Sequence, residues 1–293
     1  MTIDIAHRFV DVAGLRLHVA EAGAGPPLVL LHGWPEYWET WSTLIGLLHG
    51  RFRLIAPDLR GFGLSDKPSS GPAGDCTPGH LADDLLGILD ALGLERVGLV
   101  SHDVGAFAAQ TFARRHPERL QGLFFFDCPH PGIGSRWIDP DQVGEIWYQS
   151  FNQQPWAAEL VGSSREACRL YVGHFLRHWA HDKHAFGDLL ERWVDNFMLP
   201  GNLQGGFNWY RSIAAVRRAM MAGTAPVPAK IATRSRFLWG RHDPIIRAAW
   251  TDRLGEFFAD PVIGFAENSG HFVHVEEPDL AAAAIADFFD QRT

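Results

Sequence analysis

Short apolar runs bounded by turn residues recur along the chain and predict the strands of a sheet. They are Leu28–Leu31, Arg53–Ala56, Val97–Val100, Leu120–Phe126 and Arg236–Trp239. Strands that are buried on both faces have continuous apolar runs rather than alternating ones, so these segments favour a parallel sheet. By contrast, Phe9–Val12 and Leu15–Ala20, joined around Gly14, predict an antiparallel hairpin at the start of the chain.

Helical patterns separate several of these runs. Residues His80–Leu92 place an apolar set on one face, and the pattern ends before Gly93. That set is Leu81, Leu85, Ile88, Leu89 and Leu92. The Ala-rich stretch Ala106–His116 stops where Pro117 follows. Strands that alternate with helices are typical of βαβ units. The pattern therefore predicts the α/β class, with a mostly parallel sheet flanked by helices.

The alternation stops in the middle of the chain. From about His130 to Ala229 the pattern predicts helices, such as Arg165–Ala180 and Ala185–Phe197, and no strand. Seams rich in Pro and Gly flank this stretch, and strand–helix alternation resumes from Ser235.

A helical cap inserted into one α/β domain accounts for this arrangement. We expect residues 1–129 and 230–293 to form the core domain and residues 130–229 to form the cap, with an entry cleft between them. The remainder, including Pro68–Gly79, is predicted to be loop.

Composition excludes several classes of protein. The 293 residues are 46% hydrophobic and 20% charged, which is sufficient for a large core. A formal charge of −8 argues against a nucleic-acid partner, because such surfaces neutralise phosphates with Lys and Arg. No apolar run approaches the ~20 residues that span a bilayer, and the first residues do not read as a secretory signal. The three cysteines are isolated, which fits a reducing cytoplasm.

The segment Val97–Ala106 carries the most informative motif. An apolar strand is followed by Ser101, His102, Asp103, Val104 and Gly105, and then by a helical pattern. Small residues on both sides of a central residue permit a sharp strand-to-helix turn that exposes the middle side chain, as in a nucleophile elbow. A polar residue that simply caps the helix is the alternative interpretation of the pattern alone.

Three further motifs favour a catalytic interpretation. His32-Gly33-Trp34-Pro35 follows an early strand, Asp243 follows a late strand, and His271 lies near the C-terminus. Nucleophile, acid and histidine thus occur in the order Asp103, Asp243, His271, which is the order of the α/β-hydrolase triad.

With these motifs the chain resembles the α/β-hydrolases, and among them the epoxide hydrolases, haloalkane dehalogenases and fluoroacetate dehalogenases that use an Asp nucleophile. The loop Asp58–Pro68 is also typical of this group. The resemblance implies backbone oxyanion donors at Trp34 and Val104. An Asp nucleophile suits attack on an sp³ carbon, because it leaves an ester that water can cleave, whereas Ser would leave an ether.

Other side chains compete for these roles. Asp127 follows the strand Leu120–Phe126, where some dehalogenases carry their triad acid, although a turn-capping role is expected here. A metal site is conceivable at a row of histidines in the cap, but their spacing lacks the acid of a zinc-protease motif, so a solvated face is expected and no metal. That row is His174, His178, His181 and His184.

The leaving group decides between epoxides and halides. Opening an epoxide develops an alkoxide that needs acidic donors, and two of the four tyrosines lie in segments similar to the epoxide-hydrolase cap: Tyr148 and Tyr210. Haloalkane dehalogenases place Trp after the nucleophile, whereas Val104 stands there. Fluoroacetate dehalogenases place Arg there and three residues later, where this chain has Phe107.

The sequence therefore predicts a cofactor-independent epoxide hydrolase in the cytoplasm. Asp103 attacks the ring while Tyr148 and Tyr210 donate to its oxygen, and His271, oriented by Asp243, activates the water that releases a vicinal diol. The expected partners are a small hydrophobic epoxide and water, and the sequence leaves open whether the chain forms a homodimer. Dehalogenation, or silent binding of a small ligand, is the alternative. Weaker candidates for the pocket are His32, Phe151, Trp209 and Phe272.

Overall fold

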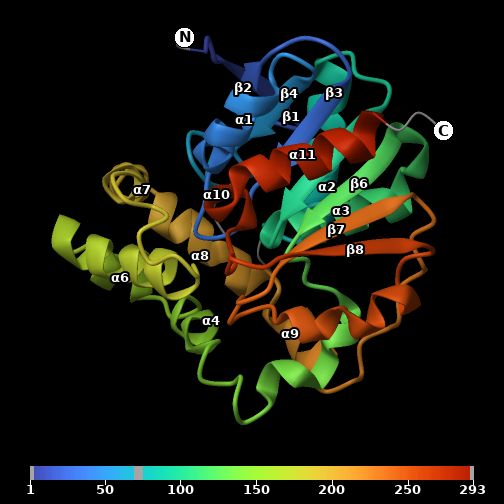
Figure 1. Cartoon of the computed structure of the whole chain (residues 1–293). Coiled ribbons are helices and arrows are strands. Elements are labelled where there is room, and N and C mark those ends of the chain that lie inside the picture. The colour runs from blue at the N-terminus through green and yellow to red at the C-terminus, as the bar shows by residue number, and fades with distance from the viewer. Residues whose placement is uncertain (1–2, 69–74, 291–293) are drawn as a thin grey trace.

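The computed structural model describes residues 3–68 and 75–290, and a twisted sheet of eight strands forms its centre. Figure 1 shows this sheet between layers of helices. The strands are β1 (Ala6–Val12), β2 (Leu15–Ala22), β3 (Pro27–Leu31), β4 (Arg53–Pro57), β5 (Val97–His102), β6 (Leu120–Phe126), β7 (Ser235–Gly240) and β8 (Pro261–Ala266).

The strand order confirms the predicted α/β class. The strands lie in the order β1-β2-β4-β3-β5-β6-β7-β8, and β2 pairs antiparallel with both β1 and β4. All other neighbouring pairs are parallel. The predicted hairpin is present, and its turn uses Ala13 and Gly14, both with positive φ.

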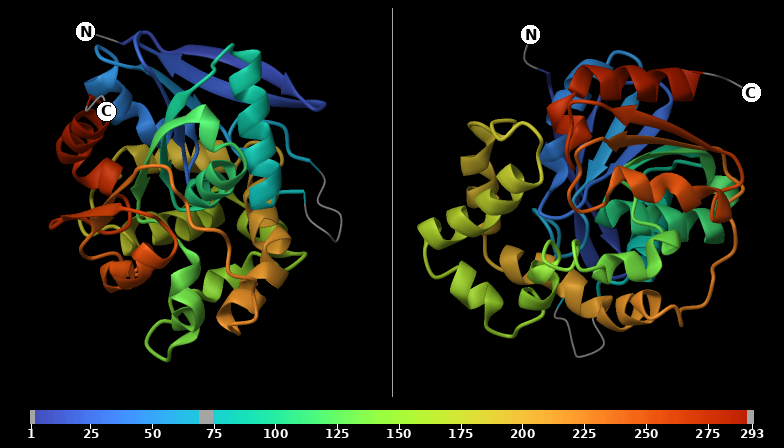
Figure 2. Two further views of the ribbon diagram at one scale, coloured as in Figure 1. Left: turned by 90° about the vertical axis from the view of Figure 1, so that its right-hand side faces the viewer. Right: turned by 60° about the horizontal axis from the view of Figure 1, so that its bottom comes forward.

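Helices cover both faces of the sheet, as the buried strands require. Helices α1 (Ser42–Leu48) and α11 (Pro278–Asp290) contact each other on one face, and α2 (Pro78–Ala91) and α3 (Val104–Arg115) contact each other on the opposite face (Figures 1 and 2). Alternate strand residues belong to two apolar clusters. Leu30 lies in the cluster on the side of α1 and α11, and Leu31 lies in the cluster on the side of α2 and α3. Such alternation follows from the two-residue repeat of a strand.

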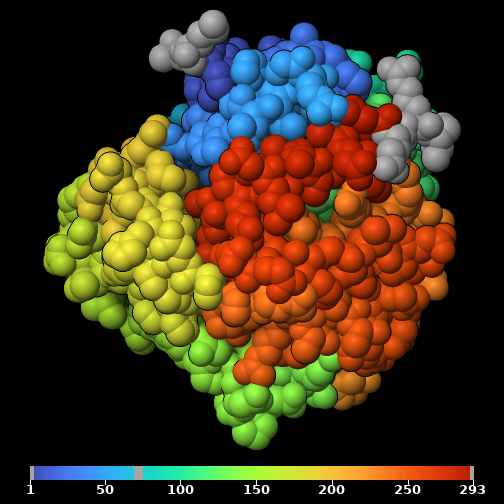
Figure 3. Space-filling view, viewed as in Figure 1, coloured from blue at the N-terminus to red at the C-terminus, as the bar shows by residue number. Residues whose placement is uncertain are grey.

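The middle of the chain is helical between β6 and β7, as predicted. Figure 3 shows this segment, in yellow and green, packed along one side of the molecule. Its helices are the 3₁₀ helix η3 (Pro131–Ile138) and the α-helices α4 (Trp147–Phe151), α5 (Ala157–Val161), α6 (Arg165–His178), α7 (Leu189–Phe197), α8 (Asn202–Ser212) and α9 (Ala214–Met221). Gly205 of α8 lies so close to Gly61 that a Cβ on Gly205 would lie 2.0 Å from the Gly61 carbonyl oxygen.

Some predicted boundaries are wrong, and local capping explains them. Helix α2 begins at Pro78 because the Thr77 side chain caps it, so Pro78 and Gly79 are helical rather than loop. Residues 69–74 of that predicted loop lie outside the described residues. Strand β8 was not predicted, because it is an edge strand whose residues are mostly not buried.

The predicted row of cap histidines does not share one helical face. Helix α6 ends at His178, so His181 and His184 lie beyond it. The His178 ring lies 2.7 Å from a carboxylate oxygen of Glu145, and His181 stacks on His242. The helix predicted from Ala185 begins only at Leu189.

The three cysteines, Cys76, Cys128 and Cys168, are buried and free. Within residues 3–68 and 75–290, no helix is both long enough and apolar enough to cross a membrane.

Candidate active site

Asp103 occupies a sharp turn between β5 and α3. Its backbone has φ 43° and ψ −109°, a conformation that L-residues rarely adopt, and α3 starts at the next residue. Two glycines make the turn possible. A Cβ on Gly105 would lie 2.3 Å from the Leu31 carbonyl oxygen, and one on Gly33 would lie 2.6 Å from the Cβ of Asp103. The predicted sharp strand-to-helix turn is therefore present, with the Asp103 side chain at its apex.

The carboxylate of Asp103 is held by a backbone donor from the neighbouring loop. The Trp34 N–H donates to its Oδ2 at 3.1 Å, and Val104, the other predicted oxyanion donor, is the first residue of α3. Burial raises the pKa of Asp103, while the positive charges of His271 and His102 and the Trp34 hydrogen bond act in the opposite direction.

His271 and Asp243 form a buried pair. His271 Nδ1 lies 2.8 Å from Asp243 Oδ2, and Asp243 Oδ1 accepts the backbone N–H groups of Ile245 and Ile246 at 2.7 and 3.0 Å. With these bonds Asp243 fixes the tautomer of His271 and leaves its Nε2 directed elsewhere. Nε2 is buried and has no hydrogen-bond partner among the described residues.

The charge around His271 favours its protonated form. Burial alone would lower the pKa, but the Asp243 carboxylate and, more weakly, Asp103 and Glu36 outweigh it and raise the pKa of His271 to about 9. The ring is thus an imidazolium while Asp103 carries its negative charge.

Asp127, the competing acid, lies in a different position. It follows β6 with φ 38°, and its Oδ1 accepts the Gly240 N–H at 2.9 Å. Burial and the charge of neighbouring Asp243 raise the pKa of Asp127 well above its ordinary value. Two buried carboxylates side by side do not both ionise. Asp127 is therefore the neutral member, and Asp243 is the one that contacts His271.

A second network, which sequence reasoning missed, lies beneath the first. Glu36 Oε2 accepts the Gly33 N–H at 2.6 Å and lies 2.7 Å from His102 Nδ1. Glu36 Oε1 lies 2.7 Å from Thr40 Oγ1 and 2.8 Å from His274 Nε2. Despite burial, the two imidazoles hold the pKa of Glu36 well below its ordinary value.

His102 connects this network to the predicted triad. Its Nε2 lies 2.9 Å from the backbone oxygen of His271 and its Nδ1 faces the Glu36 carboxylate. Both partners are acceptors, so His102 bridges two acceptors from two different segments. The ligand atoms of Glu36, His102 and His274 lie within 4.8 Å of one another, the spacing of a metal site. Hydrogen-bonding partners already surround both oxygens of Glu36, however, so these residues suit a hydrogen-bond network better than a cation site.

Tyr148 of α4 and Tyr210 of α8 meet above Trp34. The Tyr148 ring stacks on the Trp34 indole at 5.2 Å, and the Tyr210 ring meets the same indole edge-on at 5.4 Å. The two tyrosine rings are 5.5 Å apart. Burial and the charge of Asp103 raise the pKa of Tyr148, and burial together with Tyr148 and Asp103 raises that of Tyr210. Both phenols are therefore protonated donors.

The weaker pocket candidates are scattered. Both nitrogens of His32 are used, one against the Gly33 carbonyl at 2.8 Å and one by the Leu59 N–H at 3.0 Å, so it supports the loop. Phe272 packs against His271 and Trp209 against Phe107. Phe151 lies farther out, beside Trp156.

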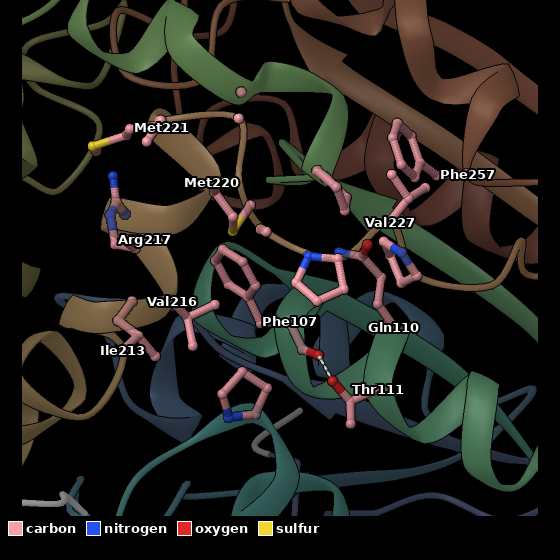
Figure 4. Close-up of a pocket in the computed structure, with 18 of the residues that line it drawn as sticks. Phe107, Gln110, Thr111, Ile213, Val216, Arg217, Met220, Met221, Val227 and Phe257 are labelled. Atoms are coloured by element: carbon pink, nitrogen blue, oxygen red, sulfur yellow. Dashed lines mark hydrogen bonds between the residues drawn. The ribbon is translucent and has the colours of Figure 1, made fainter.

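An apolar cavity with a volume of about 660 Å³ lies beside α3 and α9. Figure 4 shows Phe107, Gln110 and Thr111 of α3 along one wall, with Val216 and Arg217 of α9 on another. Phe107 lies one helical turn beyond Asp103, so the cavity adjoins the turn rather than containing the carboxylate.

Comparison with known proteins places the chain in a family. Residues 26–278 match the family model described as the alpha/beta hydrolase fold. A soluble epoxide hydrolase from Corynebacterium sp. (strain C12) is 32% identical over 300 residues, covering 99% of both chains. Epoxide hydrolase 4 from Homo sapiens is 29% identical, covering 98% of this chain and 80% of that protein.

Solved structures of epoxide hydrolases also superpose on this chain. The epoxide hydrolase CorEH without ligand superposes with a TM-score of 0.83 at 30% identity, covering 98% of this chain and 99% of that one. Epoxide hydrolase VrEH1 from Vigna radiata gives a TM-score of 0.80 at 25% identity over 98% of this chain and 99% of that one. The chain therefore belongs to the α/β-hydrolase superfamily, is epoxide hydrolase-like, and is a hydrolase enzyme.

Proposed function

We propose that the protein is an epoxide hydrolase that converts an epoxide into a vicinal diol through a covalent ester on Asp103. One observation carries the proposal: a carboxylate on a strand-to-helix turn and two protonated phenols are buried around the same Trp34. The relatives named as epoxide hydrolases support the same activity.

In the first step the Asp103 carboxylate attacks a ring carbon, and the carbon–oxygen bond of the epoxide breaks. The oxygen leaves as an alkoxide that takes a proton from Tyr148 or Tyr210. Because burial disfavours both phenolates, the phenols stay protonated until a strong base forms beside them.

The second step cleaves the ester. Esterification removes the negative charge of Asp103, which is one of the charges that raise the pKa of His271. His271 then passes its proton, directly or through solvent, to the phenolate that ring opening left, and its neutral Nε2 accepts a proton from the water that attacks the carbonyl carbon of the ester. The N–H groups of Trp34 and Val104 stabilise the tetrahedral oxyanion, and its collapse returns the Asp103 carboxylate and releases the diol.

The two parts of the chain divide this work. In the proposed assignment, core residues 1–129 and 230–293 supply Asp103, Asp243 and His271, and cap residues 130–229 supply the tyrosines. Free buried cysteines are consistent with the cytoplasm as the compartment.

Labelled water tests the proposed ester directly. Multiple turnovers of styrene oxide in ¹⁸O-water are expected to introduce ¹⁸O into the Asp103 side chain, measured by mass spectrometry of the peptide that contains it. An unlabelled Asp103 after diol formation contradicts the proposal.

Replacement of both Tyr148 and Tyr210 by Phe is expected to abolish ring opening, and undiminished turnover contradicts their role.

Dehalogenation is the second candidate, and one observation favours it. The indole N–H groups of Trp34 and Trp179 are buried without an acceptor among the described residues, and their rings are 5.7 Å apart. A halide leaving group could accept both. Incubation with a bromoalkane and with a haloacetate decides: halide release without diol formation from epoxides favours this candidate.

A further inference from the structure

One carboxylate holds the loop that carries His271. Glu276, at the end of the short helix α10 (Val273–Glu276), accepts the backbone N–H groups of Gly270 and Phe272 at its Oε1, at 2.9 and 3.2 Å. These two residues flank His271, so the carboxylate fixes the backbone on both sides of the proposed base. Hydrogen bonds to an ionised acceptor are about twice as strong as those to a neutral one.

The other oxygen of the same carboxylate holds a loop of the helical segment between β6 and β7. Glu276 Oε2 accepts the backbone N–H groups of His181 and Asp182, which follow α6, at 2.6 and 3.0 Å. Figure 3 shows the helical segment, in yellow, against the C-terminal segment, in red. Glu276 thus joins the loop of His271 to residues 179–182 through four backbone N–H groups.

The 179–182 loop also contacts His271 directly. The His271 N–H donates to the backbone oxygen of Trp179 at 2.9 Å, and the Trp179 indole meets the His271 ring edge-on, with ring centres 5.2 Å apart. The two backbones approach so closely that a Cβ on Gly270 would lie 2.2 Å from the same Trp179 oxygen. The position of the 179–182 loop therefore limits where the His271 ring can lie.

The groups of the proposed first step are held in other ways. The Trp34 N–H holds the Asp103 carboxylate, and the rings of Tyr148 and Tyr210 pack on the Trp34 indole. A change confined to Glu276 is therefore expected to act on the step that needs His271 and to spare ring opening.

We propose that Glu276 is a positioning residue: it ties His271 to the 179–182 loop, so that cleavage of the ester runs at full rate only when this loop is in place. Both of its oxygens accept backbone donors, so Glu276 acts through the backbone around His271 and not on the reacting atoms. This inference rests on the proposed ester mechanism.

Glu276→Gln tests the link. An amide has one oxygen and one NH₂ group, so one of the two backbone pairs loses its acceptor whichever way the amide turns. Rapid quenching of the reaction with styrene oxide, followed by mass spectrometry of the intact protein, measures formation and cleavage of the ester separately. Cleavage is expected to slow by about tenfold to a hundredfold, because a small misplacement of a reacting group has an effect of that order. Formation is expected to stay within a few-fold.

The steady-state constants carry a second signature. When cleavage is slow the ester accumulates, so kcat and KM fall by the same factor and kcat/KM stays constant. A mere loss of folded enzyme lowers kcat and leaves KM unchanged. Equal slowing of formation and cleavage overturns the proposal, and so does unchanged cleavage.

Glu277→Gln is the matched control. Glu277 Oε2 accepts the N–H of Asn268 at 3.1 Å and the hydroxyl of Ser269 at 2.8 Å, so it holds the same loop. Within the part of the chain that the structure describes, its side chain has no hydrogen bond to residues 179–182. This variant is expected to cleave the ester at nearly the wild-type rate. A loss as large as that in Glu276→Gln overturns the proposal.

The link can also be cut from the other side, which decides the question even if Glu276→Gln does not fold. Asp182→Pro and Asp182→Ala both remove an exposed side chain, but only Pro removes the N–H that Glu276 accepts. Ester cleavage is expected to be slower in the Pro variant than in the Ala variant. Equal rates contradict the coupling.

Hydrogen exchange separates this inference from the proposed function, because it needs no substrate. The backbone amides of residues 270–272 are expected to exchange faster in Asp182→Pro than in Asp182→Ala, as measured by mass spectrometry of the peptides. Unchanged exchange there contradicts the coupling. Faster exchange there, in an enzyme that forms no ester on Asp103, contradicts only the proposed reaction.

Discussion

The two buried aspartates, Asp127 and Asp243, show how position assigns a charge to identical side chains. Asp243 has three bonds that favour its carboxylate: His271 and two backbone N–H groups. Asp127 has one backbone donor and lies next to the charge of Asp243. The neutral form is therefore assigned to Asp127.

Asparagine replacements distinguish their roles. Asp243→Asn is expected to lower kcat on an epoxide by a factor on the order of 10²–10⁴, because the amide no longer holds the required tautomer. Asp127→Asn replaces an acid that is already neutral, so it is expected to keep kcat within a few-fold. Single-turnover kinetics on both variants measure this. Equal losses contradict the assignment.

The charge of Asp103 sets the proton affinity of His271. Asp103→Asn imitates the neutral ester, so it is expected to lower the pKa of His271 below about 9. Titration of the His271 ring signals by NMR from about pH 5 to about pH 10 measures the shift. Asp127→Asn serves as the control, and an unchanged pKa in Asp103→Asn contradicts the mechanism.

At this scale the sequence predicted the groups that motifs mark and missed those that only contacts reveal. Asp103, Asp243 and His271 stand in a recognisable chain order, and the structure brings Asp243 and His271 together. Glu36, His102 and His274 carry no common spacing, because three separate segments bring them together. The sequence offered one signal for this network: Glu36 directly follows Pro35, the last residue of the predicted oxyanion motif.

At the scale of elements, the turn from β5 to α3 depends on close backbone approach. Gly105 lies where α3 passes the end of β3, and no side chain fits between them. The central strands were predictable because continuous apolar runs mark burial on both faces. Helix starts were less so, since a cap such as Thr77, rather than periodicity, sets the first residue of α2.

Gly105→Ala tests this close approach. Its Cβ would lie 2.3 Å from a backbone oxygen, so we expect a loss of about 1–3 kcal/mol or more in the free energy of unfolding, together with lower activity. Urea denaturation measures the loss. Gly50→Ala, where nothing lies within 4 Å of the added Cβ, is the control. If the variant is as stable as the wild type, the backbone at the end of β3 can move to accommodate the added Cβ, and the close approach is not required.

At the scale of the whole molecule, Glu36 ties distant segments together. Its carboxylate joins the end of β5 through His102 and the helix α10 (Val273–Glu276) through His274. A group whose pKa is lowered by folding stabilises the fold above its unfolded pKa, and the contribution is lost as the pH falls through the folded value. His271 acts in the opposite sense: its contribution is full below about 6.5 and is lost as the pH rises through about 9.

Glu36→Gln is expected to destabilise the fold at neutral pH by about 3–5 kcal/mol, because the buried His102 and His274 rings lose their carboxylate partner. As the pH falls below about 4.5 toward the folded pKa of Glu36, the gap from the wild type is expected to narrow. Thermal denaturation across this range measures the gap, with the exposed Glu159→Gln as control. A gap that does not change with pH contradicts the assigned ionisation.

The helical segment leaves the sheet after β6 and returns to β7, and these two strands are hydrogen-bonded neighbours. Because β6 and β7 are parallel, the segment leaves at the C-terminal end of β6 and returns to the N-terminal end of β7, so it also serves as the crossover between these two strands. A segment of another length or sequence that makes the same crossover can replace it without altering the register of any strand. The segment can therefore change during evolution while the sheet that carries it stays the same. Chimaeras that carry a relative's segment on this sheet are thus expected to fold and to inherit the donor's choice of substrate.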